Sequence, residues 1–210
     1  MHLPQFANND PQAWQALITA HPLGTWFSAH DGALRADHVP FLFDPQRGPH
    51  GALLAHVSRA NQVWRNPGQG LVVFNGPQAY VSPSWYPSKH AHGKAVPTWN
   101  YAVVHVHGQA RAIEGRDEVL ALVERLTTAH EQGQAVPWQV SDAPATYIDQ
   151  LLRAIVGIEI TVDKIEGRWK MSQNRSEADR LGVTAGLQQI GSEEARAVAA
   201  LVQPPVMSAK

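Results

Sequence analysis

One short segment combines the residue types that bind phosphate. Residues 56–61 read His-Val-Ser-Arg-Ala-Asn, directly after an apolar run and before a stretch short enough for one or two helical turns. A strand that delivers a hydroxyl, a guanidinium and backbone N–H groups to a helix start suits an anion. Ser58, Arg59 and Asn61 are therefore candidates for a phosphate site, and His56 opens the same segment. The alternative is that Ser58 only caps the turn while Arg59 points into solvent.

Two loops rich in proline and aromatic residues form a second candidate site. Residues 82–89 read Ser-Pro-Ser-Trp-Tyr-Pro-Ser-Lys, and residues 96–101 read Val-Pro-Thr-Trp-Asn-Tyr. Prolines fix the backbone and aromatic rings offer flat walls, so Thr98, Trp99 and Asn100 are suited to hold a planar heterocycle. The same rings would equally cover the open end of a barrel or pack across a dimer interface, and both alternatives stay open.

A third candidate lies near the end of the chain. Residues 170–175 read Lys-Met-Ser-Gln-Asn-Arg and precede a predicted capped helix. Polar donors at the amino terminus of a helix attract anions, which marks Lys170, Gln173, Asn174 and Arg175 as candidates. The alternative is a solvated basic turn.

The eleven histidines form no recognisable metal motif. His105 and His107 share one side of a predicted strand, and His90 and His92 share a loop, but no His-Glu-x-x-His or similar spacing accompanies them. Satisfied or solvated histidines are the default interpretation, and no metal is expected. The sequence also has no glycine-rich P-loop and no Gly-x-Ser-x-Gly elbow, which argues against kinases and hydrolases of those types.

Periodicity and capping predict the elements that position these residues. Asn9-Asp10-Pro11 starts a short helix that ends before Pro22. Asp31-Gly32 between two apolar runs predicts a β-hairpin over residues 24–43. Further short strands are predicted over residues 51–57, 70–75, 79–81 and 101–113. In the last of these, apolar and small residues alternate with polar ones, so one face is buried.

The second half of the sequence is predicted to be mainly helical. A helix is expected over residues 117–131, and Thr146-x-x-Asp149 predicts the capping box of another, closed by Gly157. A strand follows over residues 158–165. Ser176-x-x-Asp179 and Ser192 then mark the starts of two last helices. We therefore expect one α+β domain over residues 1–203, an antiparallel split barrel with peripheral helices and a helical carboxy-terminal portion, and a flexible tail over residues 204–210.

Composition limits the classes of protein to which the chain can belong. It has no cysteine, which excludes disulfides and thiolate zinc sites and favours the cytoplasm. No apolar run approaches the roughly 20 residues of a membrane helix, and the start has no signal-peptide pattern. Seventeen Lys and Arg against eighteen Asp and Glu give a net charge of −1, which provides no field for DNA binding.

Taken together, these segments resemble the PaiB family of FMN-binding negative transcriptional regulators. The resemblance extends from about residue 1 to residue 200. The matching stretches are residues 38–41 (His-Val-Pro-Phe), 56–61, 80–86, 93–101, 104–105 with Gly108, and 170–175. The strings Pro-Thr-Trp-Asn-Tyr and Ser-Gln-Asn-Arg are the most specific of them.

The resemblance implies a split β-barrel related to pyridoxamine phosphate oxidases, a homodimer, and FMN bound at the subunit interface. By that pattern His38, Val39 and Pro40 run beside the isoalloxazine ring, and Ser58, Arg59 and Asn61 meet the phosphate. Residues 98–100 and 170–175 help to close the pocket. In one arrangement these residues belong to the partner subunit.

Three functions follow as hypotheses. The first is a PaiB-type regulator that represses indirectly, because no helix-turn-helix pattern or basic stripe supports direct DNA binding. The second is an FMN-dependent oxidoreductase with NAD(P)H or a small-molecule effector as partner. The third is a haem-binding or haem-degrading split barrel with a histidine as axial ligand.

Overall fold

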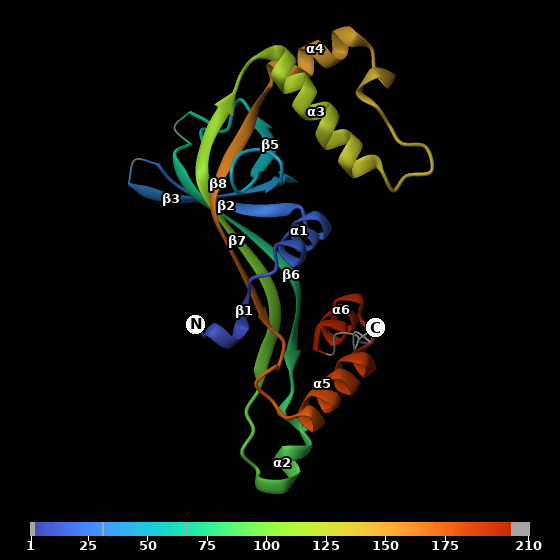
Figure 1. Ribbon diagram of the computed structural model, residues 1–210. Helices are drawn as coiled ribbons and strands as arrows, with labels where there is room; N and C mark the ends of the chain where they lie inside the picture. Colours follow the sequence, from blue (N-terminus) through green and yellow to red (C-terminus); the bar gives the residue numbers. More distant parts are fainter. Residues whose placement is uncertain (1–2, 31, 66, 203–210) are drawn as a thin grey trace. The chain divides into compact units, whose positions relative to one another are not determined.

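The computed structural model describes residues 3–30, 32–65 and 67–202 (Figure 1). The chain divides into two compact units. The sheet unit comprises Trp14–Phe74 and His105–Ile165. The terminal unit comprises Met1–Ala13, Asn75–Val104 and Glu166–Lys210. The expected single domain over residues 1–203 stays a prediction, and the expected tail over 204–210 lies outside the described residues.

The sheet unit begins with the predicted helix and hairpin. Helix α1 (Pro11–Ala20) has Pro11 as its first residue, and the Asp10 carboxylate accepts a hydrogen bond from the Gln12 N–H at 3.0 Å. Strands β2 (Leu23–His30) and β3 (Ala33–Pro40) then pair antiparallel. Gly32 takes the positive φ of 77° that the turn requires. The hairpin is confirmed, and Asp31 lies outside the described residues.

The described strands form an antiparallel sheet in the order β3-β2-β6-β7-β8-β5-β4. The remaining strands on this path are β4 (Leu42–Asp44), β5 (Ala52–Ser58), β6 (Gln69–Val81), β7 (Thr98–Ile113) and β8 (Ile155–Lys170). In β7, Val104, Val106, Gly108 and Ala110 are buried, as the alternation predicts. The predicted α+β fold with an antiparallel sheet is confirmed, although the described strands do not close into a barrel.

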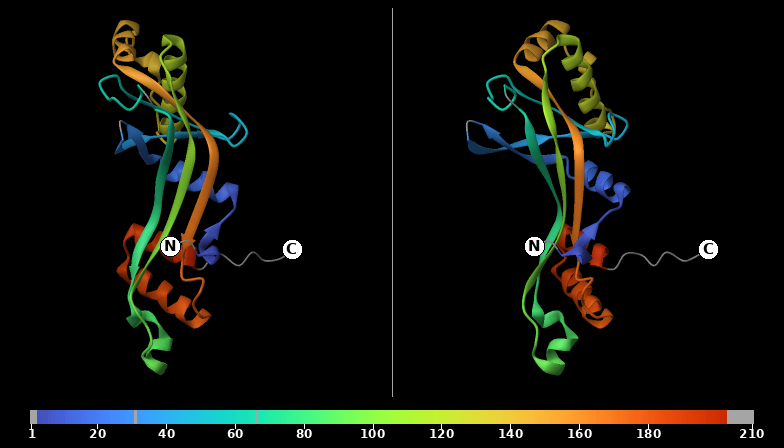
Figure 2. Two further views of the ribbon diagram at one scale, coloured as in Figure 1. Left: turned by 90° about the vertical axis from the view of Figure 1, so that its left-hand side faces the viewer. Right: turned by 60° about the vertical axis from the view of Figure 1, so that its left-hand side comes forward.

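Two helices cover one face of this sheet. Helix α3 (Arg116–Glu131) packs Val119, Leu122 and Leu126 onto Leu54 and Ile113. Helix α4 (Ala145–Arg153) adds Leu152 to the same cluster and is preceded by a short 3-10 turn, η3 (Val140–Asp142). Both views of Figure 2 show α3 and α4 together at one end of the sheet unit.

Three sequence predictions of element boundaries were wrong. Helix α4 starts at Ala145 with Pro144 before it, so Thr146 is no cap, and Asp149 binds Arg116 instead. Gly157 lies inside β8 opposite His56, where a Cβ would come within 2.8 Å of the Leu122 side chain. Strands 70–75 and 79–81 are one strand, β6, that continues through Pro77. Proline is tolerated there because the pairing of β2 with β6 ends at Val73.

The terminal unit is built from short segments, the ends of β6, β7 and β8, and three helices. Its first residues form η1 (Pro4–Phe6) and β1 (Ala7–Asn8), and β1 pairs with β8. A 3-10 turn, η2 (Pro83–Trp85), leads into α2 (Pro87–His92). Helices α5 (Glu177–Ile190) and α6 (Glu193–Val202) start at the predicted caps, since Ser176 Oγ accepts from the Asp179 N–H and Ser192 Oγ from the Ala195 N–H.

Close approach fixes the docking of η2 on α5. A Cβ at Gly186 would lie 2.3 Å from the Trp85 ring, and one at Gly182 would lie 2.0 Å from the Trp85 carbonyl oxygen. Only glycine allows the indole this contact. Among the described residues, no helix is both long and apolar enough to cross a bilayer.

Candidate functional site

Strands β3 and β5 bring several predicted residues to one surface of the sheet unit. The two strands are not neighbours in the strand order of the sheet, but they contact each other. His38 and Pro40 on β3 are exposed, as are His56 and Ser58 on β5. Val39 alternates with them and is 6% exposed, so its side chain belongs to the core. Of the three residues predicted on β3, only His38 and Pro40 therefore offer side chains to a ligand.

The turn after β5 is fixed by its own side chains. Ser58 Oγ accepts a hydrogen bond from the Ala60 N–H at 3.2 Å, and Asn61 Oδ1 accepts one from the Val63 N–H at 2.9 Å. Asn61 Nδ2 donates to Asp37 Oδ1 at 2.7 Å, which ties the turn to β3. Residues 62–65 form a turn and not a helix. The capping role proposed for Ser58 is thus observed, and it leaves the turn preorganised beside His38.

The Arg59 guanidinium is held by three groups of the sheet unit. Nη1 donates to Glu114 Oε2 at 2.9 Å, Nε to the Arg153 carbonyl at 3.2 Å and Nη2 to the Ile155 carbonyl at 3.3 Å. The side chain is 39% exposed, so it is not simply in solvent. A guanidinium carries further N–H groups beyond these three, and they remain available to an anion.

Trp64 places a second guanidinium near the first. The Arg59 carbon Cζ lies 5.3 Å from the centroid of the Trp64 ring, and that of Arg65 lies 5.5 Å from it. The indole N–H donates to the Arg59 carbonyl at 3.0 Å, which fixes the ring. Sequence reasoning missed Arg65, although a Trp-Arg pair directly after the turn was a usable signal.

A cavity of about 390 Å³ opens beside Pro40 and His56. We call it the His56 cavity; its lining is Pro40, His56, Leu126, Thr127, His130, Glu131 and Trp138. The Glu131 carboxylate is held in place because its Oε2 accepts from the Trp138 N–H at 2.9 Å. Burial lowers the pKa of His56, although part of its side chain reaches solvent, so the imidazole is neutral at pH 7. Sequence reasoning missed the α3 and Trp138 side of this cavity.

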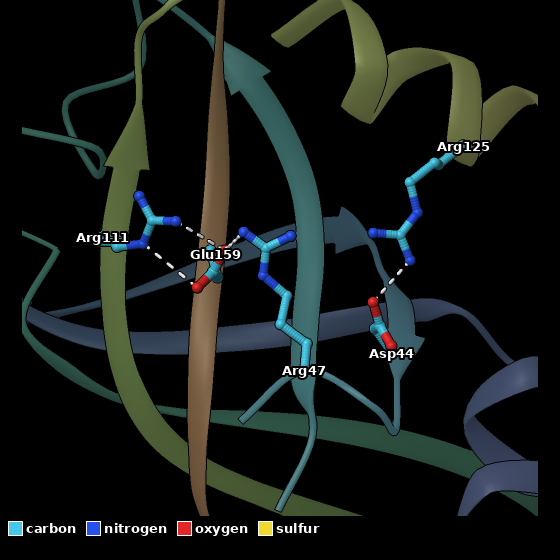
Figure 3. Close-up of polar contacts among 5 residues, drawn as sticks. All are labelled: Asp44, Arg47, Arg111, Arg125 and Glu159. Carbon is cyan, nitrogen blue, oxygen red and sulfur yellow. Dashed lines mark hydrogen bonds and ion pairs between the residues drawn. The ribbon is translucent and has the colours of Figure 1, made fainter. Parts of the chain in front are cut away.

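A charged cluster lies on the same sheet (Figure 3). The Glu159 carboxylate on β8 is 6% exposed and receives the Arg111 guanidinium through Nε at 3.3 Å and Nη2 at 2.9 Å. Arg47 approaches Glu159 from the other side at 2.5 Å. Arg125 of α3 binds Asp44 at 2.8 Å and thereby lowers the pKa of that carboxyl. These pairs fix α3 and the loop after β4 on the sheet.

The terminal unit holds the other predicted residues in a separate polar cluster. Lys170 Nζ donates to Thr98 Oγ1 and to the Trp99 carbonyl. The buried side chains of Asn100 and Ser172 bond to each other, with Asn100 Nδ2 3.0 Å from Ser172 Oγ. Burial, and then the charge of Arg175, lower the pKa of Lys170.

Other residues of the 170–175 segment form contacts within the terminal unit. Gln173 Nε2 donates to the Trp169 carbonyl at 2.5 Å, and its Oε1 accepts from the Met171 N–H at 2.7 Å. The Arg175 guanidinium lies 4.8 Å from the centroid of the Tyr86 ring. Asn174 is exposed. These residues therefore stiffen the segment before α5.

The amino terminus of α5 is already supplied with acidic groups. Asp179 is 4% exposed, and both its carboxylate oxygens accept from Ser88, at 3.1 Å from the N–H and 2.9 Å from Oγ. Burial alone would raise the pKa of Asp179, but these bonds and the nearby Arg175 outweigh it and lower the pKa. The helix end predicted to attract an anion is thus occupied by the protein's own carboxylate.

Comparison with known proteins finds a family and relatives for the chain. Residues 1–164 match the family model described as "Putative FMN-binding domain". The chain is 30% identical to the protease synthase and sporulation protein PAI 2 of Bacillus subtilis, over 97% of each chain. It is 33% identical to an uncharacterized protein of Emericella nidulans, over 90% of each. The resemblance read from the sequence motifs had implied the same FMN-binding family.

A solved structure extends the comparison to the fold. The FAD and heme binding protein from Mycobacterium smegmatis superposes with a TM-score of 0.60 at 16% identity, covering 86% of this chain and 80% of that one. At this identity the likeness concerns the fold alone, which is that of the split-barrel flavoproteins. With the family model spanning most of its length, the chain belongs to the PaiB family of FMN-binding proteins, and its cofactor is a flavin.

Proposed function

We propose that the chain binds FMN with the isoalloxazine ring in the His56 cavity and the phosphate at the turn of residues 58–61. The observation that carries this proposal is that the cavity is lined by Pro40, which the family resemblance implies beside the isoalloxazine ring, and by His56, which opens the predicted phosphate segment. Its volume of about 390 Å³ and its walls of Trp138, Pro40 and Leu126 suit a planar ring system. The neutral His56 imidazole and Thr127 offer hydrogen bonds to the edge of such a ring.

The phosphate would be held by the turn and by two guanidiniums. Ser58 and Asn61 keep the turn in shape, and the N–H groups that Arg59 does not use donate to the phosphate. Arg65 adds a second positive charge beside Trp64. Flavin chemistry belongs to the cofactor, and the protein binds and orients it.

A comparison of FMN with riboflavin tests this proposal. Flavin-free protein is titrated with each ligand while the quenching of flavin fluorescence is followed. We expect both to bind, with FMN tighter by roughly tenfold to a hundredfold, because each charge-assisted hydrogen bond to the phosphate contributes about 1.5–3 kcal/mol. Equal affinity for the two ligands would show that no phosphate site exists at this turn.

The proposal includes a homodimer. Leu34 is 85% exposed and Leu23 61% exposed on the hairpin, and Trp99 is 47% exposed beside Tyr80 in the terminal unit. Apolar side chains of this kind are normally covered by a partner. Thr98, Trp99, Asn100 and the 170–175 cluster would then complete the flavin site from a second copy. Light scattering that detects only a 23.0 kDa species at micromolar concentration would refute the dimer.

We further propose a cytoplasmic protein that regulates transcription indirectly. The support is the near-zero net charge of −1, which gives little of the phosphate attraction that even non-specific DNA binding requires. Retardation of one promoter fragment over random competitor at moderate salt would contradict this. A flavin-dependent oxidoreductase is the second candidate, favoured by the neutral His56 imidazole in the cavity. Bleaching of bound flavin by NAD(P)H would support it.

A further inference from the structure

A second cavity in the sheet unit lies near the first turn of α3. It measures about 350 Å³, and we call it the arginine pocket; its lining is Arg59, Glu114, Arg116, Val119, Asp149, Leu152 and Arg153. Within the described residues it shares no lining side chain with the His56 cavity. Its size suits a small ligand.

The arginine pocket has an apolar floor and ionic walls. Val119 is 2% exposed and Leu152 7% exposed, and both belong to the core cluster under α3 and α4. One wall carries the ion pair of Arg59 with Glu114 at 2.9 Å. A second ion pair of the lining joins Arg116 and Asp149 at 2.5 Å, and Arg116 also binds Asp117 at 2.7 Å. Buried carbon at the floor favours an apolar group, and the paired walls leave little unbalanced charge.

Arg153, in the last turn of α4, is the charged residue of the lining that belongs to neither ion pair. Its guanidinium pairs with no residue that the structure describes, while its carbonyl accepts from Arg59 Nε. Arg59 and Arg116 are both paired, and Arg116 binds a third carboxylate, Asp117, outside the lining. Arg153 therefore carries the one positive charge of the lining that has no described partner, which a monoanion neutralises, whereas a dianion would leave an excess of negative charge beside Glu114 and Asp149.

We infer that the arginine pocket binds a small monocarboxylate that carries an apolar aromatic or aliphatic group. The carboxylate meets the free Arg153 fork, which matches carboxylate geometry, and the apolar group lies on Val119 and Leu152. The assignment does not depend on the flavin.

The test is a titration with 4-fluorobenzoate followed by ¹⁹F NMR. We expect saturable binding, with the neutral isostere 4-fluorobenzamide weaker by about tenfold or more, because it cannot form a charge-assisted bond. Inorganic phosphate should not displace the probe. Equal binding of the amide, or displacement by phosphate, would overturn the assignment.

Three substitutions give effects of different sign. Arg153→Ala should weaken 4-fluorobenzoate by about tenfold or more, while Arg35→Ala, which removes an exposed arginine elsewhere in the sheet unit, should change nothing. Glu114→Gln raises the net charge of the pocket and should tighten binding severalfold. If Arg153→Ala binds within about twofold of wild type, or Glu114→Gln binds more weakly, the inference fails.

A crossed comparison separates this site from the flavin site. Arg65→Ala should weaken FMN and leave 4-fluorobenzoate unchanged, and Arg153→Ala should do the reverse. Should Arg153→Ala weaken both ligands alike, the pocket would be the seat of the FMN phosphate and the inference would be wrong. Should FMN fail to bind at all, the proposed function would fail while the benzoate result still stood.

Discussion

Replacing Arg59 with alanine separates its structural role from its role toward the cofactor. The substitution removes the ion pair with Glu114, whose side chains are 39% and 56% exposed, and the hydrogen bonds to the carbonyls of Arg153 and Ile155. Exposed pairs contribute about 0.2–1 kcal/mol, and each of the two bonds to a backbone carbonyl about 0.5–1.5 kcal/mol. The free energy of unfolding should therefore fall by about 1–4 kcal/mol.

The same substitution should also act on FMN affinity. Loss of the remaining guanidinium donors weakens FMN by roughly tenfold to a hundredfold, whereas riboflavin, which has no phosphate, should bind wild type and variant almost equally. Glu114→Gln is the matched variant, because it breaks the same ion pair but keeps the guanidinium. Its FMN affinity should equal or exceed that of the wild type.

Denaturant unfolding and quenching of flavin fluorescence measure the two effects on the same samples. A general folding defect would weaken riboflavin and FMN alike. If Arg59→Ala loses stability but keeps an FMN dissociation constant within about twofold of wild type, then Arg59 only fixes the turn and the phosphate contact is refuted.

Two further predictions concern stability. Gly186→Ala places a Cβ 2.3 Å from the Trp85 ring and should lower the free energy of unfolding by about 1–3 kcal/mol. The control Gly133→Ala places a Cβ that meets nothing within 4 Å, and it should change the free energy of unfolding little. Equal melting temperatures of the two variants would contradict the packing argument. Arg125→Met removes the largest cause of the lowered pKa of Asp44. A carboxyl group with a lowered pKa stabilises the fold above about pH 4, and this stabilisation is lost when the carboxylate is protonated in acid. The free energies of unfolding of wild type and variant should therefore differ at pH 7 and converge in acid. A difference that persists below the pKa of Asp44 would refute the pairing.

Local patterns in the sequence were sufficient for many elements. The cap and proline of α1, the alternation in β7 and the cap at Ser176 each lie within a few residues of what they specify. The failures arose where distant residues decide. Gly157 was taken as a helix end because the sequence does not show that Leu122 packs against it. Residues 70–75 and 79–81 were taken as two strands because the sequence does not show where the pairing with β2 ends.

The candidate site also combines features that local sequence patterns predict with features that distant residues decide. The segment of residues 56–61 was located from its residue types, but the helical turns expected after it are absent, because residues 62–65 form a turn. The partner of Arg59 was not foreseeable, because Glu114 is 55 positions away along the chain. The His56 cavity depends on Leu126 and Trp138, which meet β3 and β5 only after α3 has packed on the sheet.

Filling the His56 cavity tests the central claim most directly. Thr127→Trp introduces a large ring into the lining of the cavity, while Thr128→Trp adds the same ring at the next, exposed position, outside that lining. We expect Thr127→Trp to abolish the quenching of both FMN and riboflavin with little change in melting temperature, and Thr128→Trp to bind both as the wild type does. If Thr127→Trp binds FMN with wild-type affinity, the isoalloxazine ring does not lie in this cavity.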